Sequence, residues 1–494
     1  MSQKFKIFVK DIILILASIF FSIFILPFFL VLFVCPRYVY RKIVIFFAAH
    51  FKPWLYTPLS LNDCIVVWDD YHGRPRNSCC GVFYLKGRPA FADVVGRVEK
   101  LVEGRPELSC SLARWMSVYF WKKCEDFSLS NHFSQNDISD PDKFSEFAVG
   151  LIDQGYPPEN PLWELIYFPN YAHSEYGTMS AILLRFHHTL GDAIAYMALM
   201  RDLCDQNPTV DEEMDKILKT LRVRFSLSPW QKLCYVTKLI FVTPSQAVYY
   251  YLKGITSQMI PMPRSKTKYT ASIPGVTHVS TLLDISVLKS ISKKTGVKVT
   301  SIIHAGVTGA MRRMILERGG RADGDLSTIY VLPKTNHPGS MTNNSFGMPL
   351  ISPMTPEPSQ AARLARISKQ FDHLLVSPLF LGMMSLADLT GLINDTFGLT
   401  TWPWPPVASF IHSNFAFVGE PMKLFGHVAE IGIIYSGLQA GGQHLCLATT
   451  SYNGKLGIQL TGSRAIFPER ADLRKISDYI REEFEILGNH GDEV

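Results

Sequence analysis

A long apolar run lies near the amino terminus of the chain. Residues 12–35, "IILILASIFFSIFILPFFLVLFVC", carry no charged side chain. A helix of this length can cross the roughly 30 Å hydrocarbon core of a bilayer, so the run predicts a membrane-spanning anchor, with a buried core helix as the alternative. Basic residues lie on both sides of the run and give no orientation. A second apolar patch, residues 43–51, is too short to span and is expected along the membrane surface.

Beyond residue 58 the pattern alternates between strands and helices. Strands are expected at 79–85, 178–186, 278–285, 327–333 and 429–436, with a hairpin at 444–462 that turns at Asn453-Gly454. Helices are expected at 91–104, 192–204, 300–320, 358–375 and 471–487, the second of them capped by Asp192. This order predicts an α/β protein with two lobes, mixed sheets and a cleft between the lobes.

The same pattern divides the chain into four parts. Residues 1–58 form the membrane anchor and juxtamembrane segment, and residues 59–210 form an amino-terminal lobe. Residues 211–272 lack clean alternation and are predicted to be a crossover linker, in which "YYYLKGI" could touch a membrane. Residues 273–494 form the carboxy-terminal lobe.

Composition and charge narrow the classes of function. The chain has 494 residues, of which 47% are hydrophobic and 19% are charged, and its net charge is +6. This mild, scattered excess suits a membrane surface or an anionic small molecule better than nucleic acid. The nine cysteines are odd in number and form no C-x-x-C pair, which indicates reduced thiols in a cytosolic compartment.

The candidate chemistry lies at the end of the strand expected at 178–186. There "HHTLGDA", residues 187–193, places two imidazoles and a carboxylate on a strand-to-helix turn. Such a pair can be structural, with one imidazole hydrogen-bonded in the core. A metal site lacks a third ligand at the usual spacing, and a serine hydrolase lacks a G-x-S-x-G elbow. The remaining interpretation is general-base catalysis, in which an imidazole takes the proton of a hydroxyl substrate near neutral pH.

This heptapeptide resembles the H-H-x-x-x-D-G signature of the chloramphenicol acetyltransferase-like acyltransferases. Five flanking segments resemble successive blocks of one family in that group, the wax ester synthase/diacylglycerol acyltransferase family. They are residues 59–70, 159–168, 343–350, 413–430 and 451–468. The resemblance covers roughly residues 59–490 and implies two chloramphenicol acetyltransferase-like lobes.

The resemblance implies an O-acyltransferase that joins an acyl-CoA to a fatty alcohol or to diacylglycerol, giving wax ester or triacylglycerol. By the family's motif His188 is the base, His187 supports it and Asp192 is structural. Acyl-CoA is then a co-substrate, and neither a metal nor a prosthetic group is implied. An acyltransferase for another hydroxyl or amine acceptor, and a catalytically weak lipid-binding or tethering protein, are the alternatives.

The chain departs from the family pattern at two places. Ala193 replaces the glycine of the motif, which is harmless if the residue is helical, as its position after Asp192 predicts. Thr300 and Ser301 replace an Asn-Asp pair, and their hydroxyls could still bind substrate. Asn344 and Asn414 are further candidates for substrate binding, although asparagines at strand ends more often close turns.

Location follows from the anchor and the co-substrate together. Acyl-CoA is cytosolic, so the lobes are expected to face the cytosol. The sequence therefore predicts a single-pass membrane protein of the endoplasmic reticulum or of lipid droplets, in contact with membrane lipid.

Overall fold

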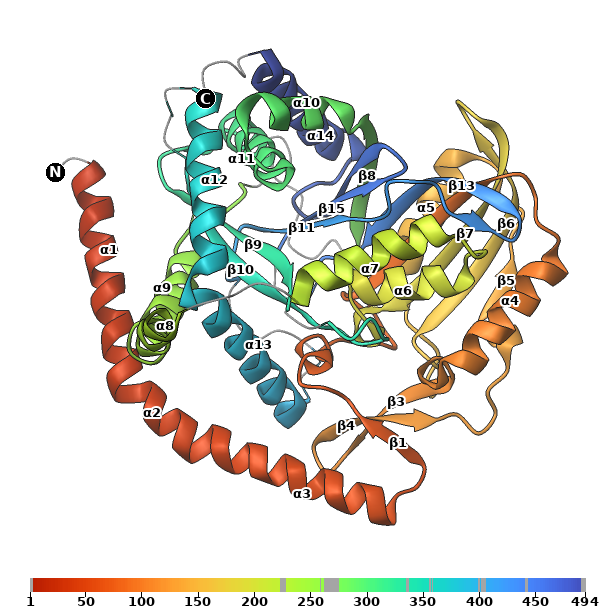
Figure 1. Cartoon of the computed structure of the whole chain (residues 1–494), viewed down its shortest axis with the longest axis horizontal. Helices are drawn as coiled ribbons and strands as arrows, with labels where there is room; N and C mark the ends of the chain where they lie inside the picture. The colour runs from red at the N-terminus through yellow and green to blue at the C-terminus, as the bar shows by residue number, and fades with distance from the viewer. Residues whose placement is uncertain are drawn as a thin grey trace.

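The structure is a computed structural model of the chain. It describes residues 3–222, 228–257, 259–261, 275–334, 337–354, 357, 359–398, 400, 406–439 and 443–489. Two six-stranded sheets form the two lobes, and a long helix curves along the left and lower edges of the molecule (Figure 1).

The amino-terminal segment is one continuous curved helix. It consists of α1 (Gln3–Phe20), a π-helical turn (Phe21–Ile25), α2 (Leu26–Phe29), a second π-helical turn (Leu30–Val34) and α3 (Cys35–Phe51). Each π-helical turn ends two residues before a proline, Pro27 or Pro36, whose ring cannot fit a regular α-helical turn. The patch 43–51, predicted as a separate segment, belongs to this same helix.

Among the described residues, Ile7–Phe51 is long and apolar enough to cross a membrane. Helices α12 (Gln360–Val376) and α13 (Pro378–Phe397), bent by 70° against each other, would add a second span only if the two counted as one. The sequence did not predict α13.

The first large sheet has the strand order β12-β13-β2-β7-β6-β5. Helices α4 (Phe91–Gly104) and α6 (Ala193–Leu203) cover one face, and α5 (Pro141–Asp153) covers the other. Strands β12 and β13 come from the second half of the chain, so the predicted division at residue 273 does not follow the sheets. The strands are β2 (Ser78–Lys86), β5 (Phe133–Gln135), β6 (Trp163–His173), β7 (Gly177–His187), β12 (Lys423–Leu424) and β13 (His427–Ser436).

The second large sheet has the order β10-β9-β11-β14-β15-β8. Helices α10 (Ser286–Thr295), α11 (Val299–Glu317), α12 and α14 (Arg470–Asn489) pack against it. The predicted hairpin is confirmed, since Asn453 and Gly454 both have positive φ, as a two-residue turn between twisted strands requires. The strands are β8 (Val276–Asp284), β9 (Asp325–Pro333), β10 (Ser345–Pro353), β11 (Phe410–Ala416), β14 (Leu445–Tyr452) and β15 (Lys455–Ser463).

A small third sheet supports the end of the amino-terminal helix. Its order is β1-β4-β3, formed by β1 (Leu55–Pro58), β3 (Cys110–Trp115) and β4 (Val118–Lys123). Val44 and Ala48 of α3 are buried against Leu55, Val118 and Phe120 of this sheet. The helix is therefore joined to the body by a core of its own.

The described part of the predicted crossover contains three helices. They are α7 (Pro208–Arg222), α8 (Pro229–Phe241) and α9 (Thr243–Ile255), and α9 contains the segment "YYYLKGI". Residues 262–272 of the predicted linker lie outside the described residues. Helix α8 packs on α9 and α13, and α9 packs on α1, so the crossover lies beside the amino-terminal helix.

Candidate active site

A cavity of about 460 Å³ lies between the two lobes. The first lobe contributes β2, the end of β7 and α6, and the second contributes β9, β10, β11 and β14. Most of its wall is apolar, which suits an aliphatic ligand with few polar groups. The apolar lining includes Ile65, Val66, Trp68, Phe186, Met197, Ile329, Val331, Phe346, Ile411, Phe415 and Ile434.

His188 reaches this cavity from the turn that follows β7. Its backbone N–H donates to the carbonyl of Asn77 at 2.9 Å, which fixes the turn. Its ring Nδ1 lies 3.1 Å from the carbonyl oxygen of Gly191, a group that can only accept, so Nδ1 carries the proton. Nε2 is then the unprotonated ring nitrogen and can accept a proton. Burial, the largest effect, lowers the pKa of His188, so the ring is neutral at neutral pH.

His187 points away from the cavity into the core. It is fully buried, and its Nε2 lies 3.1 Å from Oδ2 of Asp69. Burial acts to raise the pKa of Asp69, but the bonds from His187 and from the backbone N–H groups of Arg76 and Asn77 outweigh it, so the pKa is lowered. The carboxylate therefore fixes the ring of His187 and the loop before β2 together.

Asp192 caps α6, as the sequence predicts. Its Oδ1 accepts the backbone N–H groups of Ile194 at 3.0 Å and Ala195 at 3.1 Å. The same carboxylate reaches the second half of the chain, where it accepts from His337 Nε2 at 3.0 Å and from the N–H of Asn344 at 2.9 Å. Asp192 thus holds the turn that carries His188 against the loop before β10.

The residues around Asp192 explain the local sequence. Ala193 is the first residue of α6 and is helical, so the departure from the family's glycine carries no backbone strain. A side chain at Gly191 would place its Cβ 2.4 Å from that of Ala195. The glycine is therefore required by the close approach of the turn to α6.

The structure brings together only some of the predicted substrate-binding residues. Asn414 lines the cavity from β11 and accepts a hydrogen bond from Thr449 at 2.8 Å. Asn344 accepts from the side chain of Asn62 at 2.9 Å and belongs to the interlobe contact. Thr300 and Ser301 lie in the first turn of α11, and neither is among the described residues that line the cavity. Substrate binding by this pair has no geometric support.

Sequence reasoning missed several residues of the site. Asp63 accepts from the N–H of Asn343 at 2.7 Å and so forms a second interlobe contact. Burial raises the pKa of its carboxyl, against the effect of its hydrogen bonds. Two polar groups of the cavity wall, the hydroxyl of Tyr196 and the side-chain amide of Gln443, are buried without a hydrogen-bond partner among the described residues. A polar group of a bound ligand would satisfy them.

No group of three or more potential metal ligands occurs among the described residues. All nine cysteines are free, and Cys79 and Cys446 line the cavity. The geometry of the cavity therefore offers a neutral imidazole, a few amide and hydroxyl groups, and a largely apolar wall.

Two lobes of this topology around an interlobe cavity define the chloramphenicol acetyltransferase-like fold class. Among solved structures, the wax ester synthase/diacylglycerol acyltransferase of Marinobacter aquaeolei superposes with a TM-score of 0.58 at 16% identity, covering 88% of this chain and 100% of that one. The trichothecene 15-O-acetyltransferase of Fusarium sporotrichioides superposes with a TM-score of 0.60 at 11% identity, covering 87% and 94%. These likenesses confirm the predicted fold.

Within this class the chain is related to the wax ester synthase/diacylglycerol acyltransferase family. Residues 342–488 match the family model of the WS/DGAT C-terminal domain. Wax ester synthase/diacylglycerol acyltransferase 2 of Arabidopsis thaliana is 24% identical over 378 residues, which cover 67% of this chain and 74% of that protein. A candidate diacylglycerol O-acyltransferase of Mycobacterium tuberculosis is 24% identical over 306 residues, 57% of this chain and 60% of its own length.

Proposed function

We propose that this protein is an O-acyltransferase that transfers a fatty acyl group from acyl-CoA to a fatty alcohol or to diacylglycerol. The observation that carries the proposal is the ring of His188, whose Nδ1 is held by the carbonyl of Gly191 and which lines a largely apolar cavity. A base so fixed suits a hydroxyl acceptor with a long aliphatic chain. The family relationship supports the same class of reaction.

In the proposed mechanism Nε2 of His188 takes the proton of the acceptor hydroxyl as its oxygen attacks the thioester carbonyl carbon. The tetrahedral intermediate then collapses, the carbon–sulfur bond breaks, and the leaving thiolate of CoA takes the proton from the imidazolium. The ester and free CoA result, with no net gain or loss of protons. Because a thioester already has a good leaving group, the proposal includes neither a metal nor a prosthetic group.

His187 and Asp192 have positioning roles in this proposal. His187 is paired with Asp69 in the core, and Asp192 fixes the turn between the two lobes. The proposed mechanism assigns neither of them a step at the reacting atoms. The hydroxyl of Tyr196 and the side-chain amide of Gln443 are the proposed hydrogen-bond partners of polar substrate groups.

The acceptor and the product are lipids, so the proposal places the protein at a membrane. The apolar helix 7–51 supports attachment, and acyl-CoA supply supports lobes that face the cytosol at the endoplasmic reticulum or at lipid droplets. Attachment to a membrane does not require that the helix crosses it, and the single-pass placement predicted from the sequence is not part of this proposal.

The test uses the full chain in microsomes from a host without neutral-lipid synthesis, with labelled acyl-CoA of several chain lengths. Hexadecanol, diolein, monoolein, cholesterol and a long-chain amine are offered as acceptors. Labelled wax ester or triacylglycerol above the level of empty microsomes supports the proposal. Product from cholesterol, monoolein or the amine alone would mean that the acceptor is not a fatty alcohol or diacylglycerol. No product from any of the five acceptors would favour a lipid-binding protein.

A further inference from the structure

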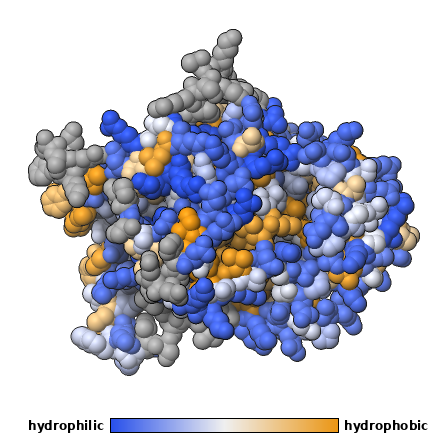
Figure 2. Space-filling view, turned by 90° about the horizontal axis from the view of Figure 1, so that it is seen from above, coloured by the Kyte–Doolittle hydropathy of each residue, from blue (hydrophilic) through white to orange (hydrophobic). Residues whose placement is uncertain are grey.

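The amino-terminal helix is longer than one bilayer crossing requires. Its 45 residues from Ile7 to Phe51 extend roughly 68 Å at about 1.5 Å per residue, more than twice the roughly 30 Å of hydrocarbon. Large apolar side chains are exposed along its whole length, from Phe8 to Phe51. Figure 2 shows apolar residues gathered at the left edge of the molecule, where α1 lies in Figure 1.

The beginning of this helix is tied to the body of the protein. Asp11 of α1 pairs with Lys253 of α9, which also pairs with Asp325 at the start of β9, at 2.5 Å. Lys253 is only 4% exposed, so its charge depends on these partners. Lys10 donates to the backbone carbonyl of Thr256 at 2.6 Å. The contact therefore joins the helix to the second lobe.

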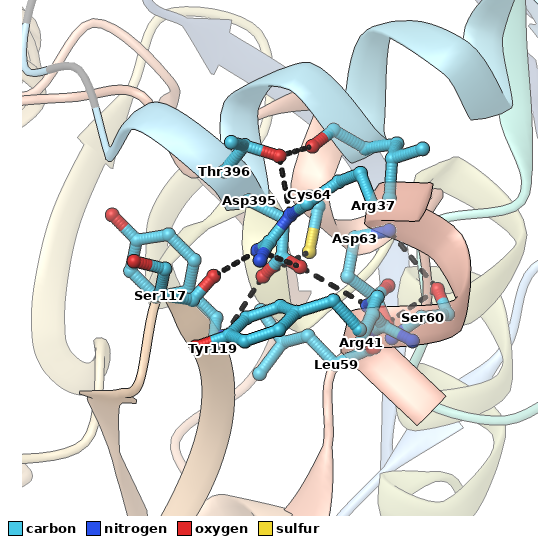
Figure 3. A network of polar contacts seen from close by, with 12 residues as sticks. Arg37, Arg41, Leu59, Ser60, Asp63, Cys64, Ser117, Tyr119, Asp395 and Thr396 are labelled. Carbon is cyan, nitrogen blue, oxygen red and sulfur yellow. Dashed lines mark hydrogen bonds and ion pairs between the residues drawn. The ribbon is translucent and has the colours of Figure 1, made fainter. Parts of the chain in front are cut away.

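The end of the helix is tied to the same body by a buried network (Figure 3). Arg41 and Arg37 of α3 lie 3.1 Å and 3.5 Å from the carboxylate of Asp395, in α13, which is fully buried. The guanidinium of Arg37 also donates to Thr396 at 2.6 Å and to the carbonyl of Ser117. Removing either partner would leave a charge buried without compensation, so breaking these ion pairs is energetically unfavourable.

The two ties decide how the helix can sit in a membrane. Asp11 and Arg37 lie roughly 39 Å apart along the helix at about 1.5 Å per residue, and the apolar run lies between them. If that run crossed the bilayer, Asp11 and Arg37 would lie on opposite sides. Their partners Lys253 and Asp395 belong to one folded body, and α9 packs on α13. A crossing helix cannot keep both ties without drawing that body through the bilayer.

A second helix continues the apolar surface beside this one. Helix α8 is amphipathic, and its outer face exposes Trp230 by 71% and Phe241 by 76%. Leu233 and Ile240 are exposed on the same face, at helical spacing. Its other face packs on α9 and α13, the two helices that hold the ties. An apolar face of this size next to an apolar helix marks a shared contact surface.

Apart from Asp11, which pairs with Lys253, the charges along the helix 7–51 and α8 have one sign. No aspartate or glutamate occurs from residue 12 to residue 62, nor from residue 216 to residue 283. Lys42 of α3 and Lys232 and Lys238 of α8 are exposed. Basic residues at the rim of an apolar surface match the anionic headgroups of a membrane leaflet and fit the surface of a soluble protein less well.

We infer that the helix 7–51 lies along one leaflet of a lipid bilayer, with both ends on the same side, and that α8 inserts its apolar face into that leaflet beside it. The partner is the hydrocarbon and headgroup region of the leaflet. The lobes then lie on the membrane surface and are not attached to it through a transmembrane helix. This placement does not depend on acyl transfer.

The first test determines on which side of the membrane each end of the chain lies. The full chain carries one tag before Met1 and a different tag after Val494, in sealed microsomes treated with protease. The inference predicts that both tags are cleaved, or both are protected, and that detergent exposes both. Protection of one tag with loss of the other means a crossing helix and overturns the inference.

The second test reads contact of α8 with lipid, in the full chain in vesicles of phosphatidylcholine and phosphatidylserine. A photocrosslinking amino acid replaces Phe241, and in the control it replaces Phe91. Phe91 is 43% exposed at the start of α4, on the side of the molecule away from α1 and α8 (Figure 1). We expect a phospholipid adduct at 241 and at most a tenth as much at 91. Equal adducts at both positions, or a protein adduct at 241, would contradict the inference.

Discussion

The Nε2 atom of His337 lies 3.0 Å from Oδ1 of Asp192, although 145 residues separate the two in the chain. The other oxygen of the carboxylate accepts the N–H of Asn344, and the same side chain caps α6. The turn that carries His188 is therefore fastened to the second lobe through one carboxylate. His188 can keep its place in the cavity only while the two lobes stay in this register.

Asp192→Ala is expected to lower the free energy of unfolding by at least about 2 kcal/mol. It removes a helix cap worth about 1 kcal/mol and hydrogen bonds to a charged group worth about 1.5–3 kcal/mol each. Asp140→Ala is the matched control, because Asp140 caps α5 through the N–H of Lys143 and has an exposed side chain. Chemical denaturation of both variants measures the difference.

A double-mutant cycle with His337→Leu checks the interlobe part of this prediction. The effects of Asp192→Ala and His337→Leu should be less than additive, since each removes the same contact. Equal losses of stability in Asp192→Ala and Asp140→Ala, together with additive effects in the cycle, would mean that Asp192 stabilises the protein only as a helix cap and not through the interlobe contact.

The dependence of the rate on pH should follow from the burial of His188. Burial lowers the pKa of the imidazole below its usual value of about 6.5. Only the neutral ring can take a proton, so kcat/KM should stay level around neutral pH and fall as pH drops through the lowered pKa. The midpoint of the acid limb should therefore lie below about 6.5. Melting curves over the same range separate titration from acid unfolding, and a midpoint above 6.5 in folded protein would exclude a buried neutral base.

Gln443→Leu should raise KM without lowering stability. The side-chain amide of Gln443 is buried at the cavity wall and has no hydrogen-bond partner in the part of the chain that the structure describes, so a ligand group is its expected partner. Loss of one hydrogen bond of about 0.5–1.5 kcal/mol corresponds to a roughly 2- to 10-fold rise in KM. Gln459→Leu is the control, since Gln459 is equally buried on β15 and donates to Thr450. The control should lose stability and keep its KM, and the opposite result would place Gln443 outside the substrate contacts.

Arg41→Met should destabilise the full chain by about 3–5 kcal/mol, because it leaves the carboxylate of Asp395 buried with fewer cations. Arg470→Met breaks an exposed pair with Asp142 and should cost at most about 1 kcal/mol. Thermal unfolding in detergent compares the two. Adding Asp395→Leu to Arg41→Met should restore part of the lost stability. If the double variant is no more stable than Arg41→Met, the unpaired carboxylate of Asp395 is not the cause of the loss.

The local features of the fold were predictable, because their signals lie within a few residues. The cap at Asp192 and the hairpin at Asn453-Gly454 follow from side-chain and backbone preferences that act over one turn. Helix α4 was predicted with the bounds that the structure has. The candidate base His188 was found from its motif, although its catalytic role stays a prediction.

The non-local features could not be predicted from the pattern. His337 has no sequence signal that links it to Asp192, and β13 gives no sign that it pairs with β2 in the other half of the chain. Two π-helical turns accommodate the prolines at 27 and 36, and the helix continues through both. Helix α13 was missed, and with it the burial of Asp395.

The measurement that tests the central claim most directly is the rate of acyl transfer by His188→Ala. Both the variant and the unchanged chain are assayed with labelled acyl-CoA and the best acceptor, and their melting temperatures are compared. We predict a loss of turnover of roughly 10²–10⁴-fold with little change in melting, the usual scale for general acid–base assistance. His373→Ala, which removes an exposed imidazole of α12, should keep the full rate. A folded His188→Ala variant that turns over near the unchanged rate would contradict the assignment of His188 as the base.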